Sequence, residues 1–206
     1  MVKRFLKDKA VLCLIVDFDQ TLITCNSTVN LTVNLLKHLL KRRDIINFIF
    51  LSSNIISRKL RIISHKKLKH TILKIGRKKF SEKDWNHIAA KLSLHINPQI
   101  ISMVREYEKK GYKILIASAA TDLILSRFVR LEGFNFDYVA SRFTENYNDY
   151  QENSGKIKLE SVKQYLKKNG LEAGIVISDN DDDLPLFEYN KSGLNFLIKD
   201  KTLIPI

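Results

Sequence analysis

The chain has 206 residues, of which 45% are hydrophobic and 28% charged, so we expect one packed domain, or a core with one insertion, and not a disordered chain. Seven glycines and three prolines are few, which argues against collagen-like, proline-rich and turn-dense all-β folds. Cys13 and Cys25 form no CxxC pair and no disulfide framework, so the sequence favours a reducing compartment and no structural zinc site.

The net charge of +13 is concentrated in one stretch of the chain. Residues 37–83 carry 15 lysines and arginines and two acids, whereas the rest of the chain carries 20 residues of each sign. Such a block either faces an anion, whether a substrate, a lipid headgroup or a nucleic acid, or is a solvated surface without a partner.

Strand and helix patterns alternate through most of the sequence. Apolar runs, typical of strands buried on both faces, occupy residues 10–17, 112–118 and 174–178, and further short strands are predicted near 136–141 and 194–198. Between them, helical spacing and capping residues predict helices over 97–111, 121–132 and 158–168. This order predicts an α/β fold with a parallel sheet, right-handed crossovers and helices on both faces.

Residues 27–96 interrupt this alternation. They lack strand patterns and show the helical spacing of Val29, Val33, Leu36 and Leu40. A capping pair, Ser81 and Asp84, marks the start of a further helix. We therefore predict a core of residues 1–26 and 97–206 and a helical, strongly basic insertion of residues 27–96.

Polar side chains gather where the predicted strands end. The first strand is followed by Asp17 and Asp19, the second ends in Ser118, and Lys158 begins the helix before the fourth. The fourth strand is followed by four acids, Asp179, Asp181, Asp182 and Asp183. Ligands of open α/β sheets bind at the carboxyl ends of the strands, so we expect these groups to share one site. Clustered carboxylates favour a hard cation such as Mg²⁺, beside which an aspartate can act as a nucleophile toward phosphorus.

Four segments resemble, in order, the motifs of the haloacid dehalogenase superfamily. They are Asp17-Phe-Asp-Gln-Thr-Leu, Ile114-Leu-Ile-Ala-Ser118, Gly155-Lys-Ile-Lys158-Leu-Glu-Ser-Val162 and Ile177-Ser-Asp179-Asn-Asp-Asp-Asp183-Leu-Pro-Leu-Phe. The resemblance covers residues 10–26 and 97–198. The helical insertion after the first motif is similar to the cap of the phosphoserine-phosphatase-like subclass. The resemblance implies a Rossmann-like core and a Mg²⁺-dependent phosphomonoester hydrolase.

The resemblance also implies a catalytic role for four residues. Asp17 would attack phosphorus and become an aspartyl phosphate. Asp19 would protonate the leaving oxygen and then activate the water that hydrolyses the intermediate. Ser118 and Lys158 would bind the phosphoryl oxygens of the substrate and balance their charge.

The implied Mg²⁺ site draws on the same strand ends. Asp179 would be a direct ligand, together with Asp17 and the backbone carbonyl of Asp19. Asp183 would act on the metal through water and Lys158. Thr21 is a weaker candidate for substrate binding.

Three positions depart from the family pattern. Gln20 and Ser178 replace glycines that are frequent beside the motif aspartates, in turns that tolerate a side chain. Asn26 stands where phosphoserine phosphatases carry a glutamate for the substrate ammonium, which argues against phosphoserine itself as the substrate. Lys156 competes with Lys158 for the lysine role, and Lys158 is preferred because an apolar residue follows it by four positions.

Other functions are compatible with parts of the sequence. A phosphomutase or phosphotransferase of the same fold would use the same acids. Asp19 disfavours both carbon–halogen chemistry and a phosphoacceptor receiver domain. A non-enzymatic protein could bind membrane or nucleic acid through the basic insertion, although Trp85 and the phenylalanines fit packing better than base stacking, so nucleic acid is not expected.

Location and partners are predicted from hydropathy and charge. The apolar runs at 10–16 and 45–56 are too short to span a bilayer, so a cytoplasmic protein is expected. Some relatives of this shape are fused to UbiA-type prenyltransferases, so we expect a small or lipid-linked phosphate as substrate. The basic insertion, with residues 45–56 as an apolar surface beside it, predicts peripheral contact with an anionic inner membrane surface through Lys66, Lys67 and Lys69.

Overall fold

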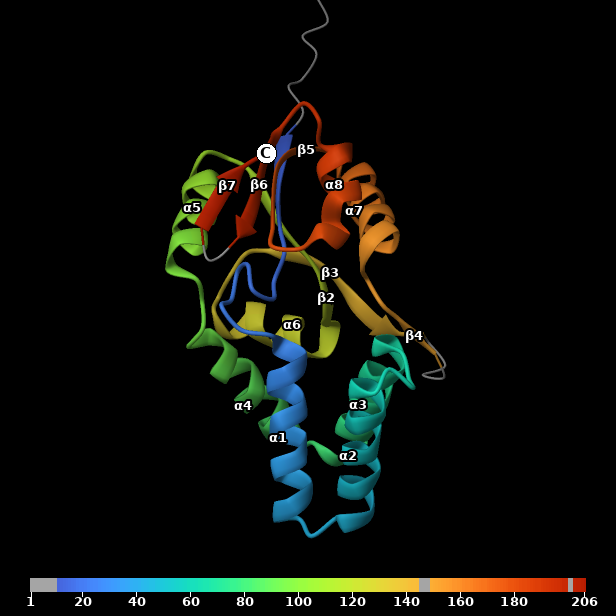
Figure 1. The fold of residues 1–206 in the computed structure, drawn as a ribbon. Coiled ribbons are helices and arrows are strands. Elements are labelled where there is room, and N and C mark those ends of the chain that lie inside the picture. The colour runs from blue at the N-terminus through green and yellow to red at the C-terminus, as the bar shows by residue number, and fades with distance from the viewer. Residues whose placement is uncertain (1–10, 145–148, 200–201) are drawn as a thin grey trace, which may run out of the picture.

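A computed structural model describes residues 11–144, 149–199 and 202–206 (Figure 1). The strands are β1 (Val11–Val16), β2 (Lys113–Thr121), β3 (Asp137–Phe143), β4 (Tyr150–Gln151), β5 (Leu171–Ser178), β6 (Leu194–Lys199) and β7 (Thr202–Pro205). The helices are α1 (Ser27–Lys41), α2 (Ile45–Lys59), α3 (His65–Lys79), α4 (Glu82–Ser93), α5 (Pro98–Lys109), α6 (Asp122–Leu131), α7 (Gly155–Asn169) and α8 (Leu184–Tyr189). Residues 1–10 of the predicted core, which include the first residue of the strand predicted over 10–17, lie outside the described residues.

The strands form one sheet in the order β4-β3-β2-β1-β5-β6-β7. The five central strands, β3-β2-β1-β5-β6, are parallel to one another, as the sequence predicts. The two edge strands, β4 and β7, are antiparallel to their neighbours and were not predicted, because two and four residues are too short to show a strand period. The α/β fold with helices on both faces of the sheet is confirmed.

Strand β1 runs through the middle of the sheet and is buried on both faces. Leu14 and Val16 pack into the core on the side of α5 and α6, whereas Cys13 and Ile15 pack on the side of α7 and α8. Adjacent side chains of a strand point to opposite faces, so both faces need apolar residues. This is the physical reason for the continuous apolar run. It leaves the polar residues of this segment at the strand's carboxyl end.

Helices α1 to α4 follow one another between β1 and α5 and extend away from the sheet (Figure 1). We refer to them as the cap helices. The prediction of helices here is correct, but the predicted stripe on α1 is not its buried face: Val29, Val33 and Leu40 are exposed. The buried face is formed by Leu31, Leu35 and Leu39, because α2, α3 and α4 pack on that side. Among the described residues, no helix combines the length and apolar character needed to cross a membrane.

Helix α4 connects the cap helices to the core. Ser81 and Asp84 form the expected capping box at its start. Its buried face, which includes Trp85, belongs to the same hydrophobic core as the inner face of α6. At the edge of this contact, Arg127 donates two hydrogen bonds to the Glu82 carboxylate at 2.7 and 2.8 Å. The cap helices are therefore held on the core by apolar packing and by an ion pair.

Candidate active site

The sequence-predicted site residues meet at the carboxyl edge of the sheet, beside the cap helices. Asp17 and Asp19 follow β1, Ser118 lies within β2, and Asp179 follows β5. The Asp17 N–H donates to the Ile177 carbonyl at 2.9 Å, so the ends of β1 and β5 stay side by side. These residues line a hollow of about 350 Å³ together with Asn26, Lys158 and Asp183 and with Thr28, His65 and Lys69 of the cap helices. We call it the catalytic hollow.

A buried lysine joins two carboxylates at the floor of this hollow. Lys158 Nζ lies 3.0 Å from Asp17 Oδ1 and 2.7 Å from Asp183 Oδ2. Ser178 donates a further hydrogen bond to the same Asp183 oxygen at 2.6 Å. The serine at the family's glycine position is thus a partner of Asp183 and not merely tolerated in a turn. Lys156 is exposed, so the geometry favours Lys158 as the motif lysine.

The electrostatics of this cluster depend on burial and on the paired charges. Burial lowers the pKa of the Lys158 amine, but the neighbouring carboxylates of Asp17 and Asp183 outweigh it, and the pKa is raised above its usual range. Burial raises the pKa of Asp17, against the opposing effect of Lys158. Lys158 therefore stays charged. The ionised form of Asp17 would be stabilised by a second positive charge beside it.

Asp19 is held by the first turn of α1. Both of its oxygens accept hydrogen bonds from Ser27, one from the backbone N–H at 2.7 Å and one from the hydroxyl at 2.9 Å. Burial raises the pKa of Asp19 to about 6, although the bonds from Ser27 act in the opposite direction. A carboxyl with this pKa can carry a proton near neutral pH and release it. Ser27 was not predicted as a site residue, and its position just after the first motif is the signal that was available.

Asp179 accepts a hydrogen bond from the Thr21 hydroxyl at 3.2 Å. Burial, and then the nearby Asp17, raise the pKa of Asp179 to about 6. Thr21 is fully buried and is not among the residues that line the catalytic hollow. The structure therefore favours a role for Thr21 in orienting Asp179, in place of the substrate contact expected from the sequence.

The donor set fits a Mg²⁺ ion that keeps several water ligands. Within the described ranges, no group of three or more histidine, cysteine or acidic side chains is arranged as a complete ligand set. Asp17 and Asp179 supply two carboxylates whose pKa values are raised first by burial, so a cation bound between them would favour their ionised forms. Mg²⁺ commonly binds through one or two carboxylates, water and substrate phosphate, so two side chains and the Asp19 carbonyl suffice.

Ser118 is fixed by residues from two other strand ends. Its backbone carbonyl accepts a hydrogen bond from Asn153 Nδ2 at 3.1 Å, and its hydroxyl accepts one from the Ala120 N–H at 3.0 Å. The next carbonyl, that of Ala119, accepts from the Ser141 hydroxyl at 2.9 Å. Asn153 is buried and was not predicted, because it lies outside the motifs and contacts Ser118 across 35 positions of sequence.

Lys69 brings a positive charge from the cap helices to the core. Its amine donates to Glu152 at 2.6 Å and to the Ala119 carbonyl at 3.4 Å, and its side chain is 9% exposed. The expectation that Lys69 faces a membrane is therefore wrong, since the residue lies inside the molecule. Lys66 and Lys67 are exposed. His65, one turn before Lys69, also lines the catalytic hollow, where burial lowers its pKa.

Two of the departures from the family pattern have a local explanation. Gln20 has a φ of 59°, in the left-handed region, where glycine has the lowest conformational energy of the amino acids. This is why glycine is frequent at that position. Asn26 is the N-cap of α1, and its side chain accepts a hydrogen bond from the Val29 N–H at 3.0 Å.

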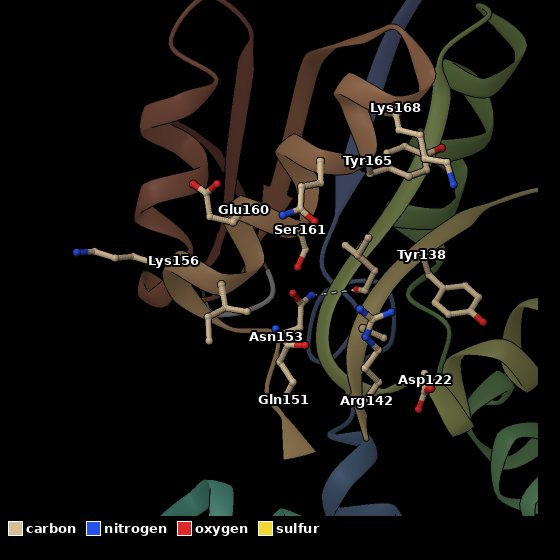
Figure 2. A pocket seen from close by; sticks show the side chains of 14 residues that line it. Asp122, Tyr138, Arg142, Gln151, Asn153, Lys156, Glu160, Ser161, Tyr165 and Lys168 are labelled. Atoms are coloured by element: carbon tan, nitrogen blue, oxygen red, sulfur yellow. Dashed lines mark hydrogen bonds between the residues drawn. The ribbon is translucent and has the colours of Figure 1, made fainter. Parts of the chain in front are cut away.

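A larger hollow of about 730 Å³ lies on the other side of Asn153, between β3 and α7 (Figure 2). Tyr138, Arg142 and Tyr165 line it, and Lys156 lies at its rim. It contains none of the motif aspartates, and Asn153 separates it from Ser118. We therefore assign the chemistry to the smaller hollow, because only there do the carboxylates, Ser118 and Lys158 converge among the described residues.

Comparison with known proteins supports the same assignment. A family model described as haloacid dehalogenase-like hydrolase matches residues 14–188. The chain belongs to this hydrolase family. The match includes all four motifs of this haloacid dehalogenase-like hydrolase and confirms the predicted family. No curated protein matches its sequence.

Solved structures share the fold of this hydrolase at low sequence identity. A protein of unknown function from Bordetella pertussis Tohama I has a TM-score of 0.68 and 16% identity, with 87% of each chain covered. A phosphoserine phosphohydrolase-like protein from Francisella tularensis has a TM-score of 0.55 and 18% identity, with 93% of this chain and 88% of that chain covered. A phospho-aspartyl intermediate analogue of phosphoserine phosphatase has a TM-score of 0.59 and 12% identity, with 91% and 86% covered. At these identities the likeness shows the fold.

Proposed function

We propose that this hydrolase is a Mg²⁺-dependent phosphomonoesterase that works through an aspartyl phosphate on Asp17. One observation carries the proposal: the Asp17 carboxyl is buried at the floor of the hollow, bonded to Lys158 and beside Asp19 and Asp179. A nucleophilic carboxylate, a proton carrier and a cation for phosphoryl oxygens are the groups that such a reaction needs.

In the first step, a carboxylate oxygen of Asp17 attacks the phosphorus of the substrate. The bond between phosphorus and the leaving oxygen breaks, and Asp19 gives its proton to that oxygen. The pKa of about 6 suits Asp19 to this task, because the acid form is present near neutral pH. Lys158 and the Ser118 hydroxyl would hold the oxygens of the transferred group.

In the second step, Asp19 takes a proton from water, and the oxygen of that water attacks the phosphorus of the aspartyl phosphate. The bond between phosphorus and the Asp17 oxygen breaks, which restores Asp17 and releases inorganic phosphate. Mg²⁺ bound by Asp17, Asp179 and the Asp19 carbonyl would supply positive charge to the phosphoryl oxygens. Asp183 and Thr21 would hold Lys158 and Asp179, respectively, in place.

The cap helices face the position that the leaving group would occupy. Lys69, His65 and Thr28 line the catalytic hollow from the cap side. We propose that these residues contact the part of the substrate beyond the phosphate, so the substrate is an anionic or polar phosphate ester that fits a hollow of about 350 Å³. A phosphomutase with the same acids would return the phosphoryl group to an organic acceptor, and release of inorganic phosphate distinguishes the two reactions.

The test is a phosphatase assay over sugar, nucleotide, amino-acid and lipid phosphates, with Mg²⁺ or with a chelator. We expect phosphate release that requires Mg²⁺ and falls by at least about 10³-fold in Asp17→Asn. Asp181→Asn is the matched control, because Asp181 lies in the same acidic loop and is not among the lining residues of the hollow. Labelled phosphate trapped by an acid quench during turnover should be found on the wild type as a hydroxylamine-sensitive adduct and be missing from Asp17→Asn. Near-wild-type turnover by purified Asp17→Asn would overturn the mechanism.

A further inference from the structure

Helix α2 presents an apolar face to solvent. Residues 45–57 contain no charged side chain, in a chain that is 28% charged. One side of the helix packs on α1 and α3 through the buried Leu51 and the partly buried Phe48 and Ile55. The opposite side exposes six apolar residues, Ile45, Ile46, Ile49, Phe50, Ile56 and Leu60. We call these six residues the α2 apolar face.

The exposure of this face is large for apolar side chains. Ile46 is 83% exposed, and Ile49 and Leu60 are 61% and 66% exposed. Single exposed apolar residues need no explanation, but a row of them along one helix is typical of a binding surface. The six positions lie on one side of α2 and its C-cap over about 22 Å, with the exposed Ser53 between Phe50 and Ile56.

Basic residues lie at both ends of the α2 apolar face. Lys41, Arg42 and Arg43 precede Ile45 in the sequence. Arg58, Lys59 and Arg61 lie on either side of Leu60, at the other end of the helix. The nearest acid, Asp44, caps α2 and is bound to Lys79 at 2.6 Å, and residues 45–81 contain no other acid. A partner of this surface must therefore combine an apolar interior with negative charge at its boundary.

From this combination we infer that the α2 apolar face docks on an anionic lipid bilayer, with α2 lying in the plane of the headgroups. Apolar side chains would enter the boundary of the acyl chains while the lysines and arginines reach the lipid phosphates. Pairing with a second copy is disfavoured, because parallel and antiparallel arrangements both bring basic clusters together. Nucleic acid is disfavoured as well, because the centre of the face offers phosphates no cation.

The position of α2 allows docking without blocking the chemistry. The connection between α1 and α2 lies at the end of the cap helices farthest from the sheet (Figure 1). No residue of the α2 apolar face is among those that line the catalytic hollow. The inference therefore does not rest on the proposed phosphatase activity, and the two can fail separately.

The experiment is vesicle flotation with the full chain. Vesicles contain phosphatidylcholine alone or with about 30 mol% phosphatidylglycerol, at about 0.1 M and about 0.5 M salt. The variants are Ile49→Ser/Phe50→Ser, which removes apolar contacts, and Arg42→Glu/Arg43→Glu, which reverses charge. Leu94→Ser is the control, because Leu94 is 83% exposed like Ile46 but lies outside the face. Circular dichroism and turnover of a small phosphate ester report whether each variant is folded.

We expect the wild type and Leu94→Ser to float with anionic vesicles at low salt and to be released at high salt. Each double variant should bind at least about tenfold more weakly while its fold and turnover stay unchanged. In Phe50→Trp, brominated acyl chains should quench the added fluorescence beyond that of the buried Trp85. The inference would be overturned if the fluorescence of Phe50→Trp were not quenched, or if Ile49→Ser/Phe50→Ser bound vesicles as well as the wild type. It would also be overturned if the wild type formed a dimer that Ile49→Ser/Phe50→Ser dissociates, or if it bound an oligonucleotide more strongly than vesicles.

Discussion

Lys158 connects two buried carboxylates through a single ammonium group. Its Nζ lies 3.0 Å from Asp17 and 2.7 Å from Asp183. Lys158→Ala removes this charge and a contact to the phosphoryl group, and each charged hydrogen bond is worth about 1.5–3 kcal/mol. We therefore expect kcat/KM for the preferred ester to fall by roughly a hundredfold or more, whereas Lys156→Ala should stay near wild type because Lys156 is exposed. A larger loss in Lys156→Ala than in Lys158→Ala would contradict the assignment.

At the residue scale, the motif side chains were predictable and their supports were not. Asp17, Asp19, Ser118, Lys158, Asp179 and Asp183 were all named from short motifs. Ser27 and Asn153 lie outside the motif segments. Ser27 contacts Asp19 from the first turn of α1, and Asn153 contacts Ser118 across 35 positions of sequence. Ser178 lies inside a motif, yet a hydrogen bond from its hydroxyl to Asp183 depends on the path of the loop that follows.

Helix α3 contacts the core through apolar packing and through a largely buried ion pair. Lys69 donates to Glu152 at 2.6 Å, and the two side chains are 9% and 17% exposed. Either Lys69→Met or Glu152→Gln leaves one partner unpaired, which costs several kcal/mol for a buried pair, about 3–5. The double variant removes both charges, so it should be more stable than the sum of the single losses predicts. Urea unfolding of the four proteins measures this coupling, and additive losses would show that the pair does not hold α3 on the core.

At the scale of elements, long periodic segments were predictable and short ones were not. The central strands and the helices α5, α6 and α7 have clear patterns in the sequence. Helix α8 spans six residues, Leu184–Tyr189, at the end of the fourth motif, and strand β4 spans two, so neither is long enough to show a repeating pattern. On α1, apolar residues occupy two sides of the helix, and only the packing of α2, α3 and α4 decides that the side of Leu31 is buried.

The whole molecule carries its net positive charge in one part of the fold. The segment that carries the entire net charge of +13 begins within α1 and ends within α4, in the cap helices. The catalytic hollow gathers acids at the sheet edge, and Lys69 and His65 approach it from the cap side. The cap helices therefore contribute the positive charge of Lys69 next to the carboxylates, while no residue of the α2 apolar face lines the hollow.

The buried carboxylates of the hollow make the stability of the metal-free protein depend on pH. The pKa of Asp19 is raised to about 6 by burial, whereas an unfolded aspartate titrates near its ordinary value of about 3.9. Between these two values the folded state binds more protons than the unfolded state, so the free energy of unfolding falls as pH rises. The contribution of Asp19 is fully present below about pH 4 and is lost above about pH 6. With about 1.36 kcal/mol per pKa unit, the loss reaches at most about 3 kcal/mol.

Asp19→Asn isolates this effect, because asparagine does not titrate but can still accept the hydrogen bond from the Ser27 N–H. In the presence of a chelator, urea unfolding between about pH 4 and 7 should show the wild type losing stability relative to Asp19→Asn as pH rises. Mg²⁺ requires ionised carboxylates, so its stabilising effect on the wild type should grow over the same range and be weaker in Asp179→Asn. A difference between wild type and Asp19→Asn that stays constant with pH would show that Asp19 keeps its ordinary pKa, and the proton carrier of the reaction would then have to be sought elsewhere in the hollow.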